Sequence, residues 1–162
     1  MKKLCFIIAL TIAFFCATAT RAAAQEKGDW TLGVRTGLYT HSGDGAKYAV
    51  GLTSRYNPID GLRIEPSVLW VVGRGCSVDV SFNVHYTFSL TRRNNMWLYP
   101  IVGIGVNEVN HWSMGVNLGA GYDWDFHRHW VFTTEVIYVV QTANHRYLKN
   151  PIVPKVGISY KF

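Results

Sequence analysis

The chain has 162 residues, with a formal net charge of +6 and a hydrophobic content of 49%. Residues 1–24 open with a methionine and two lysines, continue as an apolar run and end in three alanines, which predicts a cleaved secretory signal. Without this leader, 13 basic residues remain against 10 acidic ones, and Cys76 is the only cysteine. The composition therefore excludes an internal disulfide, gives no argument for a nucleic-acid partner, and leaves residues 25–162 as one domain.

Alternating side chains predict the first β-strand at residues 30–39. Leu32, Val34 and Leu38 fall on one face of this segment, and Arg35 falls on the other face with two glycines. A period of two residues is that of a β-strand. The alternation recurs along the chain and predicts eight strands, at residues 30–39, 48–56, 62–72, 77–88, 96–106, 112–126, 130–140 and 155–162.

Short polar connections separate these strands. The turn after the second strand is expected at residues 57–61, and the longest connection is expected at residues 141–153. Residues 73–77 are expected to close a hairpin in which Val72 lies opposite Val78. Antiparallel counting then places Glu65 opposite His85.

The segment 112–126 indicates which face meets which environment. Its even-numbered residues are all apolar or aromatic, with the aromatic residues at the two ends, and its odd-numbered residues are Ser, Gly, Asn or Asp. A face rich in glycine is not that of a solvated exterior. The apolar face is therefore predicted to meet lipid and the small polar face to line a narrow lumen, with Leu118 outward and Asn117 inward.

These features predict an all-β fold, an eight-stranded antiparallel up-and-down transmembrane β-barrel. A closed barrel is favoured because an open sheet edge in lipid would leave backbone groups without hydrogen-bond partners. Nine of the fifteen glycines fall on the inward face of the predicted strands. Eight strands enclose a lumen barely wide enough for side chains, so these glycines make room for the long inward residues.

The last predicted strand places Ile158, Tyr160 and Phe162 at alternating positions. Together with the leader, the eight strands and their aromatic ends, this resembles the small outer-membrane β-barrels of the OmpA-like and OmpX-like kind over the whole mature chain. The resemblance implies export to the cell outer membrane, contact with its lipids and lipopolysaccharide, and a monomeric state. It also implies that the barrel-assembly machinery recognises Ile158, Tyr160 and Phe162.

Such barrels include adhesins, anchors, enzymes and small pores, so the resemblance does not fix a function. The expected outer loops are short, which disfavours an adhesin. Nine charged or titratable side chains are predicted to face the lumen, where they either line a small pore or form a plug of paired charges. The narrow lumen favours the plug. The set is Arg35, Arg55, Arg63, Glu65, Asp79, His85, Asp123, Glu135 and Lys155.

The alternative of a lipid A-modifying enzyme finds little support in the residues. The deacylase type has a His-x-Ser motif followed by a late glutamate, whereas residues 141–145 read Gln-Thr-Ala-Asn-His. His41, His111 and His145, with Glu108, lie in predicted loops but lack a metal-ligand spacing. No catalytic residue, metal ligand or cofactor is predicted. The expected role is structural, envelope-maintaining or weakly surface-binding.

Overall fold

A computed structural model describes residues 27–40, 45–73, 75–91, 95–108, 112–141 and 150–162. The predicted signal peptide and the three loop histidines lie outside these residues. Among the described residues, no helix is long and apolar enough to cross a membrane. The strands are β1 Trp30–Tyr39, β2 Lys47–Ile59, β3 Leu62–Gly73, β4 Gly75–Tyr86, β5 Phe88–Ser89, β6 Met96–Asn107, β7 Ser113–His127, β8 Trp130–Gln141 and β9 Ile152–Lys161.

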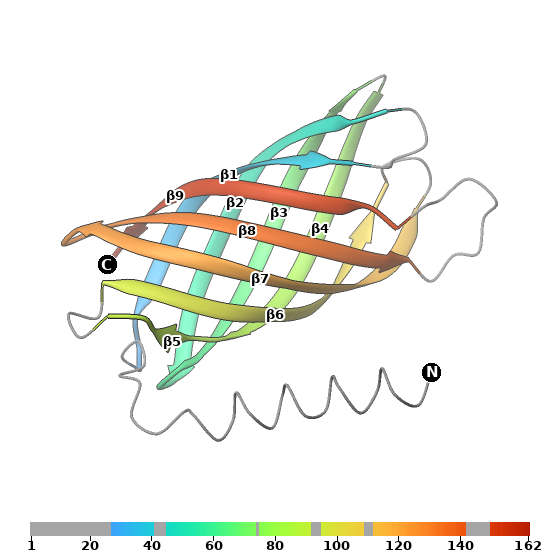
Figure 1. Cartoon of the computed structure of the whole chain (residues 1–162). Helices are drawn as coiled ribbons and strands as arrows, with labels where there is room; N and C mark the ends of the chain where they lie inside the picture. The colour runs from blue at the N-terminus through green and yellow to red at the C-terminus, as the bar shows by residue number, and fades with distance from the viewer. Residues whose placement is uncertain (1–26, 41–44, 74, 92–94, 109–111, 142–149) are drawn as a thin grey trace, which may run out of the picture.

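The strands form one closed antiparallel barrel, as predicted (Figure 1). Each strand pairs with its neighbours along the chain, and β9 returns to pair with β1. β5 is the continuation of β4, because both pair with β6 in the same register, His85 with Ile101 and Phe88 with Leu98. With β4 and β5 taken together, the barrel has the eight strands that the alternation predicts.

The break between β4 and β5 lies opposite a proline. Pro100 faces Tyr86 in this register but has no backbone N–H to donate to the ladder. Pro66 has the same effect between β2 and β3, where pairing is interrupted between Thr53 and Tyr56. Both prolines point outward. Pro66 within the third strand is therefore compatible with the barrel, although the backbone pairing of β3 with β2 is interrupted beside it.

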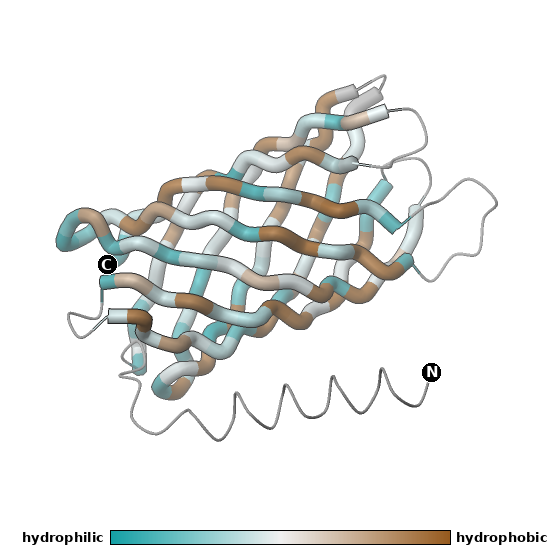
Figure 2. Tube along the Cα trace, viewed as in Figure 1, coloured by the Kyte–Doolittle hydropathy of each residue, from teal (hydrophilic) through white to brown (hydrophobic). Residues whose placement is uncertain are grey.

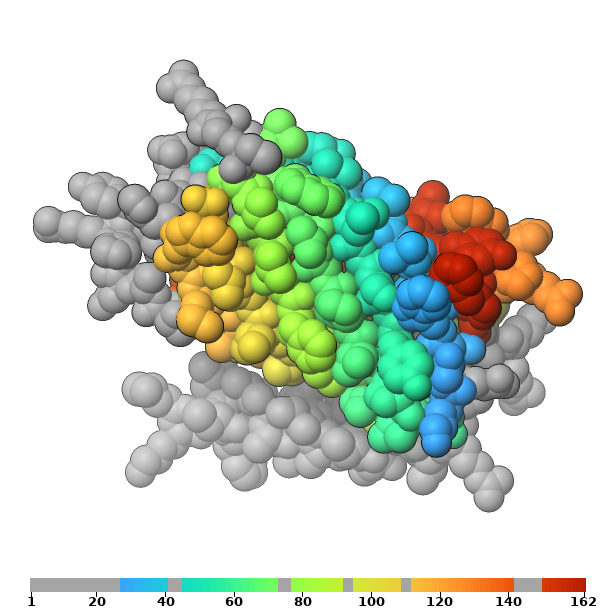
Figure 3. All heavy atoms as spheres, turned by 180° about the vertical axis from the view of Figure 1, so that it is seen from behind, coloured from blue at the N-terminus to red at the C-terminus, as the bar shows by residue number. Residues whose placement is uncertain are grey.

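Hydrophilic and hydrophobic residues alternate along much of each long strand (Figure 2), and many of the hydrophobic side chains are exposed. On β7, Leu118 is 44% exposed, whereas Asn117 is buried. Figure 3 shows the opposite side of the barrel, where the side chains of β1 to β4 form adjacent bands from blue to green. The predicted facing of Leu118 and Asn117 is confirmed. The exterior is a belt of exposed apolar side chains.

The predicted register of the β3–β4 hairpin is wrong by two residues. Val72 pairs with Cys76, because the ladder continues to Gly73 and Gly75, and the hairpin needs fewer turn residues than expected. Glu65 therefore lies opposite Asn83, and His85 lies opposite Arg63. A shift of two residues keeps every side chain on its predicted face, because the strand period is also two.

Two other strands, β2 and β9, extend by three residues beyond a predicted end. β2 continues to Ile59, so the turn shortens to Asp60-Gly61, with Gly61 at a φ of 78°. That positive φ is readily adopted by glycine. β9 begins at Ile152, which pairs with Tyr138. Backbone pairing with the neighbouring strand outweighs the turn-forming composition at both places.

The two ends of the barrel differ. At the end that carries both termini of the barrel, hereafter the terminal end, the Phe162 N–H donates to the Trp30 carbonyl and the Lys161 N–H to that of His129. At the other end, hereafter the loop end, the Thr40 N–H donates to the Ile152 carbonyl. The loop end carries the longest connection, between β8 and β9.

Phe162 also lies in a cluster of aromatic rings across the seam where β9 meets β1. Its ring stacks on Trp30 with centroids 4.7 Å apart, and it meets Tyr160 edge-on at 5.1 Å. Phe162→Ala is expected to lower the stability of the refolded protein by about 0.5–1.5 kcal/mol for each ring pair lost, as measured by denaturant unfolding. If Phe162 is also an assembly signal, the amount of this variant assembled in cells is expected to fall by more than its loss of stability would cause.

Phe126→Ala is the matched control, since Phe126 is an exposed aromatic that contacts Trp124 at 6.0 Å on β7. Quantitative blotting of outer-membrane fractions compares the two variants. Equal cellular assembly of both would count against an assembly role for Phe162.

Candidate functional site

The polar side chains predicted to face the lumen meet in its interior. Arg55 comes from β2, Arg63 and Glu65 from β3, Asp123 from β7 and Glu135 from β8. Each occupies an inward position of its strand, and each is at most 3% exposed. Five long or charged side chains from four strands therefore share one buried layer.

Arg55 is the centre of this layer. Its Nε donates to Glu65, its Nη1 to both oxygens of Asp123 at 3.0 and 3.1 Å, and its Nη2 to Glu135 at 2.6 Å. Nη2 also donates to the Tyr99 hydroxyl at 3.0 Å. The planar guanidinium carries five N–H donors, which suits it to several acceptors at once. A single side chain thus ties β2 to β3, β6, β7 and β8 across the lumen.

Asp123 is the main acceptor of the layer. It accepts from Arg63 Nη1 at 2.7 Å and from the Thr133 hydroxyl at 2.6 Å, in addition to Arg55. The Tyr99 hydroxyl lies 3.0 Å from both Asp123 and Glu135. Buried carboxylates are stable only when they are paired and hydrogen-bonded, and Asp123 has both kinds of partner.

The Tyr99 side chain is a part of this layer that sequence analysis missed. Its ring lies against the guanidinium groups of Arg55 and Arg63, at 5.6 and 5.2 Å from the ring centroid. It also covers Gly121 on β7, where an added Cβ would overlap the ring. The alternation of side chains along β6 could have identified Tyr99. Leu98 and Val102 face outward, so Tyr99 must face inward.

Four other predicted lumen residues lie around this layer. Arg35 approaches Glu65 at 3.7 Å and donates to Ser159 at 3.3 Å. Asp79 lies apart from the Arg55 contacts and accepts from Tyr39 at 2.7 Å and from Ser81 at 2.6 Å. Lys155 is buried opposite Glu135, and His85 stacks on the Tyr99 ring at 4.8 Å.

The charges of the central layer balance. The ion pairs join three arginines to three carboxylates, and these six side chains are hereafter the ionic layer: Arg35, Arg55, Arg63, Glu65, Asp123 and Glu135. Removing one member leaves an uncompensated buried charge, which is far less favourable than the intact set. The ionic layer therefore links β1, β2, β3, β7 and β8 across the lumen.

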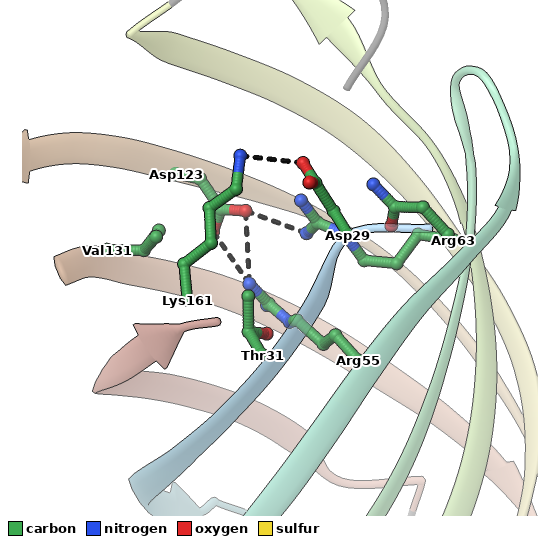
Figure 4. Close-up of a pocket in the computed structure, with 8 residues that line it drawn as sticks. Asp29, Thr31, Arg55, Arg63, Asp123, Val131 and Lys161 are labelled. Atoms are coloured by element: carbon green, nitrogen blue, oxygen red, sulfur yellow. Dashed lines mark hydrogen bonds and ion pairs between the residues drawn. The ribbon is translucent and has the colours of Figure 1, made fainter. Parts of the chain in front are cut away.

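A shallow pocket at the terminal end leads to the ionic layer (Figure 4). Arg55, Arg63 and Asp123 line its floor, and Lys161 pairs with Asp29 at 2.6 Å beside its rim. The Lys161–Asp29 pair is partly exposed, unlike the pairs beneath it. Water at the terminal end can therefore approach the ionic layer from this side.

Apolar side chains gather in the other half of the lumen, beside buried polar residues such as Asp79 and Asn107. Leu69, Val71, Ile137, Val139 and Val153 point inward close to the loop end. These belong to a buried cluster, hereafter the apolar layer: Tyr39, Ala49, Leu69, Val71, Tyr99, Ile101, Ile137, Val139 and Val153. The lumen thus contains two different buried layers.

No family model matches the sequence, and no curated protein matches it. Solved structures do match in fold. The N-terminal β-barrel domain of Pseudomonas aeruginosa OprF superposes with a TM-score of 0.68 at 13% identity, covering 85% of this chain and 100% of that one. The outer membrane protein OprG from Pseudomonas aeruginosa gives 0.60 at 16% identity, covering 86% and 98%.

A de novo designed transmembrane β-barrel matches equally well, with a TM-score of 0.63 at 15% identity over 86% of this chain and 99% of the design. The fold is therefore that of the small transmembrane β-barrels found in bacterial outer membranes. The fold alone does not identify an activity.

Proposed function

We propose that the protein is an integral outer-membrane barrel with a structural role in the cell envelope, and that its lumen conducts neither ions nor solutes. The observation that carries this proposal is Arg55, which bridges β2 to β3, β7 and β8 through buried ion pairs. An eight-stranded barrel has little interior beyond its side chains, and here both halves of the lumen are filled.

The exterior supports residence in a bilayer. Apolar side chains such as Val102, Ile104 and Val136 are 50–61% exposed in the middle of their strands, where a soluble barrel would present polar groups. Tryptophans and tyrosines gather toward the strand ends, as expected at membrane interfaces. Outer-membrane lipids and lipopolysaccharide are the partners that this surface fits.

The orientation follows from the connections. Short turns are periplasmic and longer loops extracellular in outer-membrane barrels. The terminal end has the two-residue turns after β2 and β7, and the loop end has the long β8–β9 connection. The terminal end would therefore face the periplasm, and Ile158, Tyr160 and Phe162 would be presented there to the assembly machinery.

Planar-bilayer recording of the refolded protein tests the closed lumen. Wild-type protein is expected to give no steady conductance steps under conditions in which a large open porin, the positive control, gives clear ones. Insertion is verified separately by the heat-dependent migration of the folded barrel on gels. Steady steps that scale with the amount inserted would contradict the proposal and favour a small pore.

The enzyme alternative is tested on whole cells. Mass spectrometry of lipid A is expected to give the same acyl-chain pattern with and without expression of the protein. Loss or gain of an acyl chain upon expression would favour a lipid A-modifying enzyme instead.

A further inference from the structure

Several buried polar atoms in the middle of the lumen lack a protein partner. Both ring nitrogens of His85 and the Oε2 atom of Glu135 accept or donate no hydrogen bond within the described part of the chain. Both side chains are only 1% exposed. A buried polar atom left unsatisfied costs about 1–3 kcal/mol, so these atoms indicate a ligand.

His85 and Glu135 lie close to each other and to Glu65 in the lumen. Ligand atoms of Glu65, His85 and Glu135, from β3, β4 and β8, lie within 4.8 Å of one another. The stacking of His85 on Tyr99 fixes the plane of the imidazole. A small molecule that makes hydrogen bonds of about 2.8 Å to two of these atoms would span a separation of this order.

Two carboxylate oxygens at this place are already in use. Glu65 Oε2 accepts from Arg55 Nε, and Glu135 Oε1 accepts from Arg55 and lies within hydrogen-bond distance of Tyr99. Glu135 Oε2 and the two ring nitrogens of His85 have no protein partner among the described residues. The site thus offers an acceptor beside a group that, when neutral, both donates and accepts.

Charge selects the class of ligand. The ionic layer already balances three guanidinium groups with three carboxylates. A divalent cation would add two positive charges beside Arg55. An anion would face the carboxylates of Glu65 and Glu135. Burying either ion without a compensating charge is unfavourable. A neutral molecule that both donates and accepts hydrogen bonds matches the site, and water is the smallest one.

We propose that a bound water molecule bridges His85 to Glu135 in the closed lumen, as the anchor of a small internal water cluster. It donates to Glu135 Oε2 and completes the hydrogen bonding of one His85 ring nitrogen. Unpartnered polar atoms of Arg35, Thr53 and Ser67 continue the cluster along β1 to β3. Buried waters of this kind typically make about three hydrogen bonds to polar groups that lack other partners.

Solution NMR of the refolded protein in detergent micelles, with the histidines labelled with ¹⁵N, tests the proposal. The His85 ring N–H is expected to show a cross-peak to a slowly exchanging water. His85→Phe keeps a ring to stack on Tyr99 but has no ring N–H, so loss of the cross-peak in this variant assigns it to His85. A His85 N–H that shows a hydrogen-bond coupling to Glu135 and no contact with water would overturn the proposal.

A metal titration distinguishes a bound water from a metal ion, which is the main alternative ligand. Addition of Zn²⁺ to the wild-type protein is expected to leave the His85 ring signals unchanged at one equivalent. Stoichiometric Zn²⁺ binding that shifts these signals, and that is lost in His85→Phe, would overturn the water assignment in favour of a metal site. Because both measurements use the wild-type protein, they decide the question even if His85→Phe does not fold. The closed lumen is tested separately by conductance.

Discussion

Replacing Arg55 by methionine is expected to lower the free energy of unfolding by about 3–5 kcal/mol, because it leaves buried carboxylates without their cation. Arg55 is the partner of Glu65, Asp123 and Glu135 at once. Methionine fills part of the same volume, so the loss reports mainly the uncompensated charge. Urea unfolding in lipid vesicles, followed by tryptophan fluorescence, gives the value.

Lys155→Met is the matched control. Lys155 is a buried cation in the same lumen, but it forms no ion pair with any described residue within 4.0 Å. Its replacement is expected to change the stability by much less than that of Arg55. If the two variants lose equal stability, the Arg55 contacts are not what holds the strands together.

Replacing Leu118 by arginine tests the exterior in the same way. Leu118 lies near the middle of β7 on the outward face and is 44% exposed. Arginine at the bilayer midplane of an outer-membrane barrel costs about 2–4 kcal/mol, and the loss is expected to appear in unfolding from lipid vesicles.

Met114→Arg provides a control on the same strand and face. Met114 is the second residue of β7, close to the loop end, and is 62% exposed. The penalty for arginine falls to about 0–1 kcal/mol near the membrane interface. A loss as large for Met114→Arg as for Leu118→Arg would contradict the assignment of a membrane belt with its centre near Leu118.

The facing of the strands could be predicted from the sequence because it depends on a local property. Successive side chains point to opposite faces, so Leu118 and Asn117 are separated by parity alone. The same parity survives the two-residue error in the β3–β4 register. The error itself arose at the hairpin tip, where Gly73 and Gly75 extend the ladder beyond the expected turn.

The apolar layer could have been predicted but was not. Leu69, Val71 and Val139 occupy inward positions, and no packed apolar set was expected on the lumen face. The parity of their strands gave the correct direction. An inward apolar residue is compatible with a lumen that is packed, so the assumption of a uniformly polar interior caused the omission.

The contacts of the ionic layer could not be predicted from the sequence. Arg55 and Asp123 are 68 residues apart and lie on strands that do not pair with each other. Their meeting depends on how the barrel closes and on which rotamers fill the lumen. Pattern reasoning identified the inward charges, but only the three-dimensional arrangement identifies Arg55 as their common partner.

The central claim is that the barrel lies in lipid with a closed lumen, and spin labelling along β7 in lipid vesicles tests it most directly. Single cysteines are introduced at successive positions of Ser113–His127 after Cys76→Ser, and each label is exposed to molecular oxygen and to a polar nickel chelate. Labels at Val116, Leu118 and Ala120 are expected to be accessible to oxygen, and the label at Asn117 is expected to be shielded from both reagents. Access of the nickel chelate to the inward labels would contradict the closed lumen, and its access to the outward ones would contradict the membrane belt.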